Sequence, residues 1–184
     1  MKIRVFFITL CFSIMLYGCG NALSRQPDII LTPQSEDECL RFQIALDKNT
    51  YSLEDDAKIT YSLQTNDCGW IFVNKRFFPN NGVAGEINLY FTSSNGKQMM
   101  YPIPDGRVQE LNEYDFVFLR TNESVSYTQE LFTSVVNGCD PGECYIQAVY
   151  ENNKDVPNRS EVRSESIWKG TLTSNYVKVT VKSH

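Results

Sequence analysis

Histidine is nearly absent from the sequence, and the single one is the last residue, His184. A chain terminus is a poor place for a general base, because the ends of a domain are seldom held in one position. The sequence therefore excludes Ser-His-Asp and Cys-His nucleophilic catalysis, and it excludes metal sites built from several histidines.

Signatures of other chemistry are missing as well. The sequence has no nucleophile elbow, zinc-protease motif, phosphate-binding loop or dinucleotide-binding fingerprint. Two carboxylate runs, 36–38 and 54–56, are the candidates for calcium binding or acid–base chemistry. Acidic residues are common in exposed turns, which is the favoured explanation for both runs. We predict no catalytic residue, no metal, no cofactor and a function other than catalysis.

Positive charge is scarce too. The chain has 17 Lys and Arg residues against 22 Asp and Glu, and its formal net charge of −5 falls to −7 if a leader carrying Lys2 and Arg4 is removed. An acidic protein repels phosphate backbones, so nucleic acid is excluded as a partner.

The apolar run from Val5 to Tyr17 is too short to span a bilayer. Its 13 residues fall below the roughly 20 of a transmembrane helix. A run of this length after Lys2 and Arg4 instead suits the core of a signal peptide.

The end of that run, Leu16-Tyr17-Gly18-Cys19, resembles the bacterial lipoprotein signal. The resemblance implies cleavage of residues 1–18, a diacylglyceryl thioether on Cys19 and an acylated new N-terminus. Several acyl chains give stable anchoring, so the lipid bilayer is an implied partner and the bacterial cell envelope the implied location. Gly20 replaces the Asp that retains lipoproteins in the inner membrane, which implies the outer membrane in a Gram-negative cell. The alternative is an ordinary secretory signal with an incidental cysteine.

Residues 19–36 continue with mostly polar residues and include Pro27 and Pro33. This composition predicts a flexible tether that carries the lipidated cysteine. A single folded domain is expected over residues 37–184.

Within that domain, apolar and polar residues alternate in short stretches separated by turn signals, and no stretch shows the period of a helix. The alternation is clearest at 41–46, 57–64, 86–91 and 176–181. The run Trp70–Val73 is apolar throughout, which predicts a strand covered on both faces with Trp70 in the core. The pattern predicts an all-β fold, a single immunoglobulin-like β-sandwich of about eight antiparallel strands after a cleaved leader.

Two local patterns carry a resemblance to known folds. Pro141-Gly142-Glu143-Cys144-Tyr145 resembles the tyrosine corner of immunoglobulin-like domains, with Tyr145 in the corner role. The opening strands and the pattern Trp168-x-Gly170-x-x-x-Ser174-Asn175 resemble proteinase-inhibitor domains of the BsuPI type, over about residues 40–182. The chain shows no inhibitory motif, so inhibition does not follow from the layout alone.

Four cysteines follow the leader, and an even number in an exported chain indicates two disulfides. Cys39 precedes the first strand and Cys68 follows the second, while Cys139 and Cys144 flank a short turn. These positions favour Cys39–Cys68 and Cys139–Cys144 among the three possible pairings. The alternatives are a sandwich-spanning Cys68–Cys144 bond and a zinc site, which is disfavoured because the C-x₂-C spacing is absent.

The best candidates for a binding surface are Arg76, Phe77 and Phe78, together with the charged stretch 152–165. A loop aromatic that stays exposed can stack on a sugar or fill a partner's pocket, although Phe77 and Phe78 are alternatively expected to tuck under the end of the sandwich. The sequence thus predicts a membrane-anchored envelope lipoprotein that binds a protein or a glycan without catalysis. The alternative is a proteinase inhibitor that acts through loops at one end of the sandwich.

Overall fold

The computed structural model describes residues 33–35, 37, 39–52, 54–76, 86–100, 111–131, 139–154 and 166–183. These residues form ten strands and one short 3₁₀ helix, η1 (Glu113–Asp115). In this part of the chain, no helix has the length and apolar character needed to cross a bilayer.

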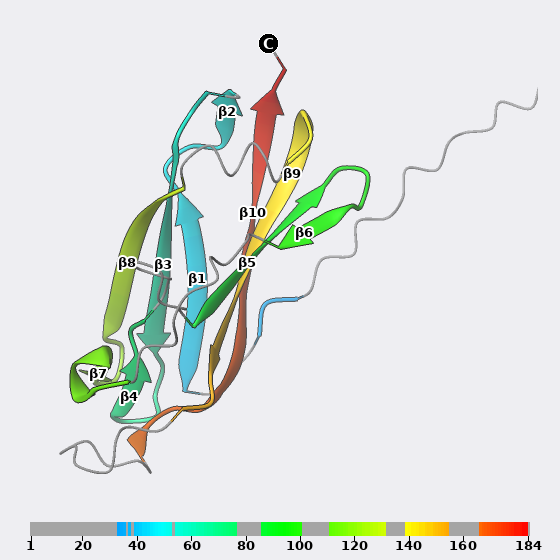
Figure 1. Ribbon diagram of the computed structural model, residues 1–184. Helices are drawn as coiled ribbons and strands as arrows, with labels where there is room; N and C mark the ends of the chain where they lie inside the picture. The colour runs from blue at the N-terminus through cyan, green and yellow to red at the C-terminus, as the bar shows by residue number, and fades with distance from the viewer. Residues whose placement is uncertain are drawn as a thin grey trace, which may run out of the picture.

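The strands form two facing sheets with a smaller third sheet at one end (Figure 1). The three-stranded sheet has the order β1 (Leu40–Leu46), β3 (Ala57–Thr65), β8 (Ser124–Leu131). The five-stranded sheet has the order β2 (Thr50–Ser52), β10 (Gly170–Lys182), β9 (Gly142–Asn152), β5 (Ile87–Ser93), β6 (Gln98–Met100). The small sheet pairs β4 (Ile71–Asn74) with β7 (Phe116–Leu119).

The predicted all-β, immunoglobulin-like sandwich is confirmed, with two differences in detail. The described residues contain ten strands instead of about eight, and β2 pairs with β10 in parallel, whereas the other named pairs are antiparallel. The parallel pair arises because the chain crosses from one sheet to the other between β1 and β2, and β2 then lies along the last strand. The sequence pattern shows which residues face inward but not which edge a three-residue strand joins.

The core is built from the inward-facing positions of both sheets. Leu40, Phe42 and Ile44 on β1 are buried, and the residues between them are more exposed, which is the period of two expected of a strand. The other buried core positions on the central strands follow the same rule: Ile59, Tyr61, Leu63, Leu89, Phe91, Ile146, Ala148 and Tyr150. The rings of Phe42 and Tyr150 meet across the sandwich, with their centroids 5.9 Å apart.

Strand β10 contains a bulge that reverses its inward-facing side. Leu172 and Ser174 are buried before the bulge and Val179 and Val181 after it, so the buried set changes from even to odd positions. One extra residue in a strand has this effect, because side chains alternate between the two faces. The Ser174 carbonyl accepts a hydrogen bond from the Gln147 side chain, so the bulge remains bonded to β9.

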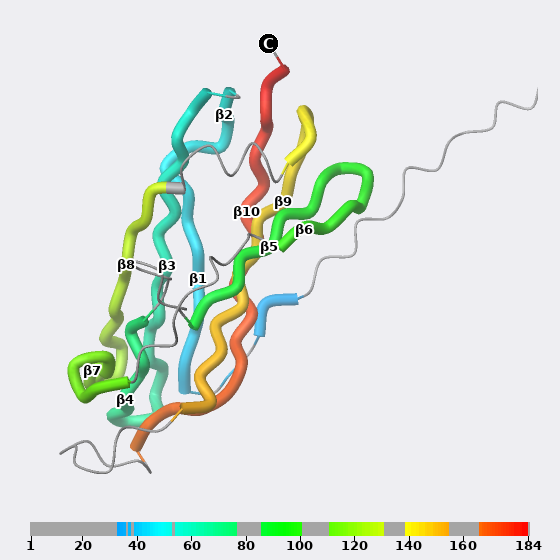
Figure 2. The backbone as a smooth tube through the Cα atoms, viewed as in Figure 1, coloured from blue at the N-terminus to red at the C-terminus, as the bar shows by residue number. Residues whose placement is uncertain are grey.

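The bulge also joins the two sheets. The Asn175 side-chain oxygen accepts a hydrogen bond from the Ile44 backbone N–H at 2.8 Å, and its Nδ2 donates to the Ile44 carbonyl at 3.0 Å. The amide thus pairs with the free edge of β1 as a neighbouring strand would. Figure 2 shows β1 and β10 rising side by side along this seam. Just below, the Ser35 N–H donates to the Thr173 carbonyl at 3.0 Å.

The tryptophan of the C-terminal pattern lies in the core. Trp168 is 8% exposed and stacks on Tyr150 with a centroid distance of 5.7 Å. Gly170 passes directly over its indole: a Cβ at this position would lie 2.9 Å from Cζ2 of Trp168, and the backbone φ of +154° also favours glycine. The Trp-x-Gly spacing therefore reflects a close approach of backbone to ring.

The expected tyrosine corner is absent at Tyr145. This residue is the fourth of β9, and its ring meets Tyr176 of β10 edge-on at 6.0 Å. Because β9 begins at Gly142, Tyr145 lies inside the strand and not at the turn that contains Pro141.

Replacing Asn175 by Ala removes both hydrogen bonds that join β10 to Ile44. Because two partly buried backbone groups lose their partner, we expect the free energy of unfolding to fall by about 1–3 kcal/mol in urea denaturation. Thr171→Ala, at an exposed position of the same strand, is the matched control. It should change the free energy of unfolding by less than about 0.5 kcal/mol. Equal effects of the two substitutions would show that the amide does not link the sheets.

Candidate binding site at the disulfide end

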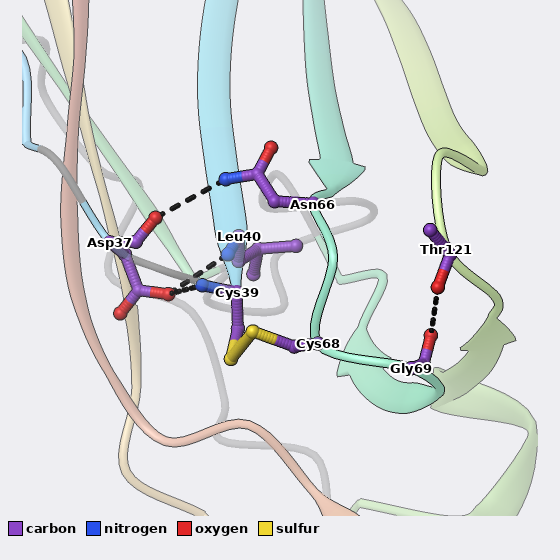
Figure 3. Close-up of a disulfide and its surroundings, with 7 residues drawn as sticks. All are labelled: Asp37, Cys39, Leu40, Asn66, Cys68, Gly69 and Thr121. Carbon is purple, nitrogen blue, oxygen red and sulfur yellow. Dashed lines mark hydrogen bonds between the residues drawn. A yellow bond between two sulfur atoms is a disulfide. The ribbon is translucent and has the colours of Figure 1, made fainter.

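One end of the sandwich carries the Cys39–Cys68 disulfide, a polar pocket and the β4–β7 sheet; we call it the disulfide end. The disulfide joins the residue before β1 to the loop after β3 (Figure 3). The second disulfide joins Cys139 and Cys144, so both favoured pairings are present. The Thr121 hydroxyl donates to the Gly69 carbonyl at 3.0 Å and holds the same loop from the other side.

A pocket of about 320 Å³ opens beside this disulfide. Its lining is polar apart from one leucine, and comprises Gln34, Ser35, Asp37, Leu40, Arg41 and Asn66. Two of these residues, Gln34 and Ser35, belong to the stretch that was expected to be a tether.

Hydrogen bonds hold the walls of the pocket in place. The Asp37 Oδ1 atom accepts from the backbone N–H groups of Cys39 at 2.9 Å and Leu40 at 2.8 Å, and the Asn66 side chain donates to the Asp37 carbonyl at 3.3 Å (Figure 3). On the other wall, Gln34 donates to the Phe42 carbonyl at 3.1 Å. The pocket is therefore largely formed before any ligand enters.

Three groups of the pocket retain hydrogen-bonding capacity within the described part of the chain. They are the second carboxylate oxygen of Asp37, the side-chain oxygen of Asn66 and the guanidinium of Arg41, which lies on the exposed face of β1. Together they offer acceptors, donors and one charge of each sign. Such a set suits a polar ligand with several hydroxyl or amide groups.

An aromatic platform lies on the other side of the disulfide, on the β4–β7 sheet. Trp70 is 55% exposed and Phe118 is 38% exposed, and their ring centroids are 5.7 Å apart. Phe72 lies beside Phe118 as its cross-strand partner, with a centroid distance of 5.2 Å. Tyr114 of η1, the short helix that precedes β7, adds a third exposed ring, at 77% exposure. Large aromatic surface left in water at a domain end is typical of a binding site.

A buried polar cluster attaches the platform sheet to the sandwich. Asn74, the last residue of β4, donates to Glu86 Oε1 at 3.2 Å, and Lys154 pairs with the same oxygen at 2.8 Å. The Asn152 side chain donates to the Trp168 carbonyl at 2.7 Å, and the Tyr150 hydroxyl donates to the Asn74 carbonyl at 2.9 Å. Burial, reinforced by the Glu86 carboxylate, raises the pKa of Tyr150 well above its usual range, so the hydroxyl remains a donor.

Of the residues predicted to form a binding surface, the structure describes Arg76. It follows β4, and its guanidinium lies 4.0 Å from the Asp115 carboxylate, with both side chains mostly buried. This ion pair holds η1 against β4. Phe77, Phe78 and the lipidation candidate Cys19 lie outside the described residues, as does most of the stretch 152–165.

The prediction that Trp70 lies in the core is wrong. The apolar run was expected to be covered on both faces, but β4 pairs with β7 at the end of the sandwich, which leaves the start of the run in water. Trp168 takes the core position instead. The sequence contained one signal for this outcome: Trp70 follows the turn Asn66–Gly69, and residues beside a turn are often exposed.

The carboxylate run 54–56 behaves as turn charge. Asp55 accepts a hydrogen bond from the Ser52 backbone N–H and lies 3.8 Å from the Lys48 ammonium, and these two partners lower the pKa of its carboxyl. Across the described residues, no group of three or more His, Cys, Asp or Glu is arranged to hold a metal ion.

Comparisons with known proteins identify no family. No family model matches the sequence, and no curated protein matches it. Solved structures to which the chain shows some similarity include a β-glucosidase from Erythrobacter marinus (15% identity, TM-score 0.36, 80% of this chain and 15% of that one). Two others are the CARDB domain of a Pyrococcus furiosus protein in complex with di-metal ions (10%, 0.37, 82% and 100%) and the sporulation control protein Spo0M of Bacillus subtilis (9%, 0.39, 79% and 50%). The chain thus spans 15% of the β-glucosidase it resembles.

The buried cluster predicts a stability effect at Asn152. Replacing Asn152 by Ala leaves the Trp168 carbonyl without its donor, so we expect a loss of about 1–3 kcal/mol in the free energy of unfolding. The adjacent, exposed Asn153→Ala is the matched control and should leave stability nearly unchanged. Thermal and urea unfolding of both variants measure the difference, and an unchanged Asn152→Ala variant would contradict the assignment.

Proposed function

We propose that the protein is a lipid-anchored component of the bacterial cell envelope that binds a protein or a glycan through its disulfide end, without catalysis. The observation that carries the proposal is the exposed aromatic platform of Trp70 and Phe118 beside a polar pocket. Contact between large aromatic rings and water is unfavourable for a domain on its own. Their exposure at one end of this domain therefore supports a binding role.

The anchor part of the proposal is supported by the sequence Leu16-Tyr17-Gly18-Cys19 and by the position of residues 33–35. This segment is bonded to β1 and β10 at the disulfide end. A chain that leads from Cys19 to this point would bring the site to the side of the domain nearest the lipid.

Palmitate labelling of the protein in a bacterial host tests the anchor. We expect the label on the wild-type chain and its complete loss in Cys19→Ala, because a thioether needs the cysteine sulfur. Cys11→Ala, which changes a second cysteine of the same leader, is the matched control and should retain the label. Label that persists in Cys19→Ala would contradict the lipoprotein proposal.

Affinity capture from a solubilised envelope extract tests the binding part. We expect Trp70→Ala to capture at least about tenfold less of each partner than wild type does. The reason is that truncating a central aromatic anchor typically weakens binding by about 2 kcal/mol or more. Tyr176→Ala, on the outer face of β10 and similarly exposed, should retain them. Identical captured sets for wild type and Trp70→Ala would contradict binding at the disulfide end.

Proteinase inhibition through end loops remains the alternative hypothesis. Such inhibition requires a loop that binds in the active site of a protease. The candidate residues Phe77 and Phe78 lie outside the described part of the chain. A peptidase captured by wild type and by Trp70→Ala alike would favour it.

A further inference from the structure

We infer that the disulfide end binds a neutral oligosaccharide, with one sugar ring on Trp70 and the hydroxyl groups of a neighbouring ring in the pocket beside Arg41, Asp37 and Asn66. The inference rests on the proposed binding function and names the ligand class of the same site.

The platform has the chemistry of a sugar-stacking surface. A sugar ring presents weakly positive C–H groups on its faces, and these are attracted to the negative face of an indole. Trp70 is 55% exposed, and the ring of Phe118 lies 5.7 Å from it, so the indole has a neighbouring ring in contact and keeps much of its surface in water. A ring already held in place loses little conformational entropy when a ligand stacks on it.

The pocket supplies the polar half of such a site. Carboxylate, amide and guanidinium groups are planar and offer paired acceptors or donors, which match neighbouring hydroxyl groups on a sugar. Asp37, Asn66 and Arg41 provide one of each. The backbone bonds to Asp37 and the Asn66 bond to its carbonyl fix two of the three groups before binding.

The charges of the pocket favour a neutral ligand. Arg41 and Asp37 carry opposite charges, so an anionic or a cationic polymer meets one like charge for each opposite one, and the chain as a whole is acidic. An apolar protein surface would bury the second carboxylate oxygen of Asp37 and the guanidinium of Arg41 without giving them partners, which is unfavourable. Hydroxyl groups satisfy both charges by hydrogen bonding.

The two halves lie close enough for one ligand. Trp70 is four positions after Asn66 in the chain, so their Cα atoms are no more than about 14 Å apart. The Cys39–Cys68 disulfide and the Thr121–Gly69 hydrogen bond hold this short connection from both sides (Figure 3). A stacking surface and a separate polar pocket are two subsites, and a ligand that occupies both has more than one sugar ring.

Titration of the full-length protein with neutral tetrasaccharides tests the inference. The probes are chitotetraose, cellotetraose and maltotetraose, with tetragalacturonate as the anionic comparison, in a detergent without a sugar headgroup. Calorimetry gives the affinity, and tryptophan emission reports the site directly because the second tryptophan, Trp168, is buried. We expect at least one neutral probe to bind with a Kd in the micromolar to millimolar range and to shift the emission, and tetragalacturonate to bind at least tenfold more weakly.

Single substitutions then separate the two halves. Trp70→Ala should weaken binding at least tenfold, and Arg41→Gln, at an exposed position, should weaken it about three- to tenfold, while Tyr176→Ala should bind as wild type does. Unchanged melting temperatures confirm that each variant folds.

Three results would overturn the inference. They are no binding of any neutral probe, equal binding of the anionic probe, and weakening by Trp70→Ala with none by Arg41→Gln. In each case the proposed binding function survives if Trp70→Ala still loses its envelope partners in affinity capture, and it fails if those partners are retained.

Discussion

The amide of Asn175 is the interaction on which the arrangement of the two sheets depends. It bonds both polar groups of the Ile44 backbone and so closes one side of the sandwich without a continuous ladder. The bulge that presents Asn175 also reverses the inward face of β10, so that Leu172 below it and Val181 above it both reach the core. Without the bulge, one half of this long strand would turn its apolar side chains to water. The adjacent pair Ser174-Asn175 therefore has a structural role in holding β10 between β9 and β1.

A second polar device serves the disulfide end in the same manner. The small β4–β7 sheet is too short to be stable alone, and the cluster of Asn74, Glu86, Asn152 and Lys154 attaches it to the large sheet. A backbone bridge between Phe72 and Ile167 adds to this attachment. Because most of these bonds run to side chains and not along a ladder, the sheet can stand at the end of the sandwich and present one face to solvent. The polar side chains that attach the small sheet are buried, and the rings of Trp70 and Phe118 remain exposed to solvent.

The sequence predicted the fold better than the site. Alternation located most strands, because one face of each is buried, and the disulfide pairing followed from strand order. The features that the sequence did not predict depend on which strands pair in the folded domain. Trp70 opens an apolar run, whereas Trp168 follows a polar stretch and precedes Lys169, yet the pairing of β4 with β7 leaves the first exposed while the second is buried. The roles of Asp37 and Asn66 were equally hidden, because residues 29 positions apart meet there only after β1 and β3 have paired.

Residues 33–35 give the domain a mechanical property. Gln34 is bonded to β1 and Ser35 to β10, so tension applied through the N-terminal segment reaches both sheets at once, next to the seam that Asn175 closes. A pull shared between two sheets loads several hydrogen bonds together instead of peeling one strand from an edge. The Cys39–Cys68 bond, a few residues farther along, covalently ties the start of β1 to the loop after β3. The end of the domain that receives the load is thus the end that also carries the pocket and the platform, and the disulfide and these hydrogen bonds oppose its deformation.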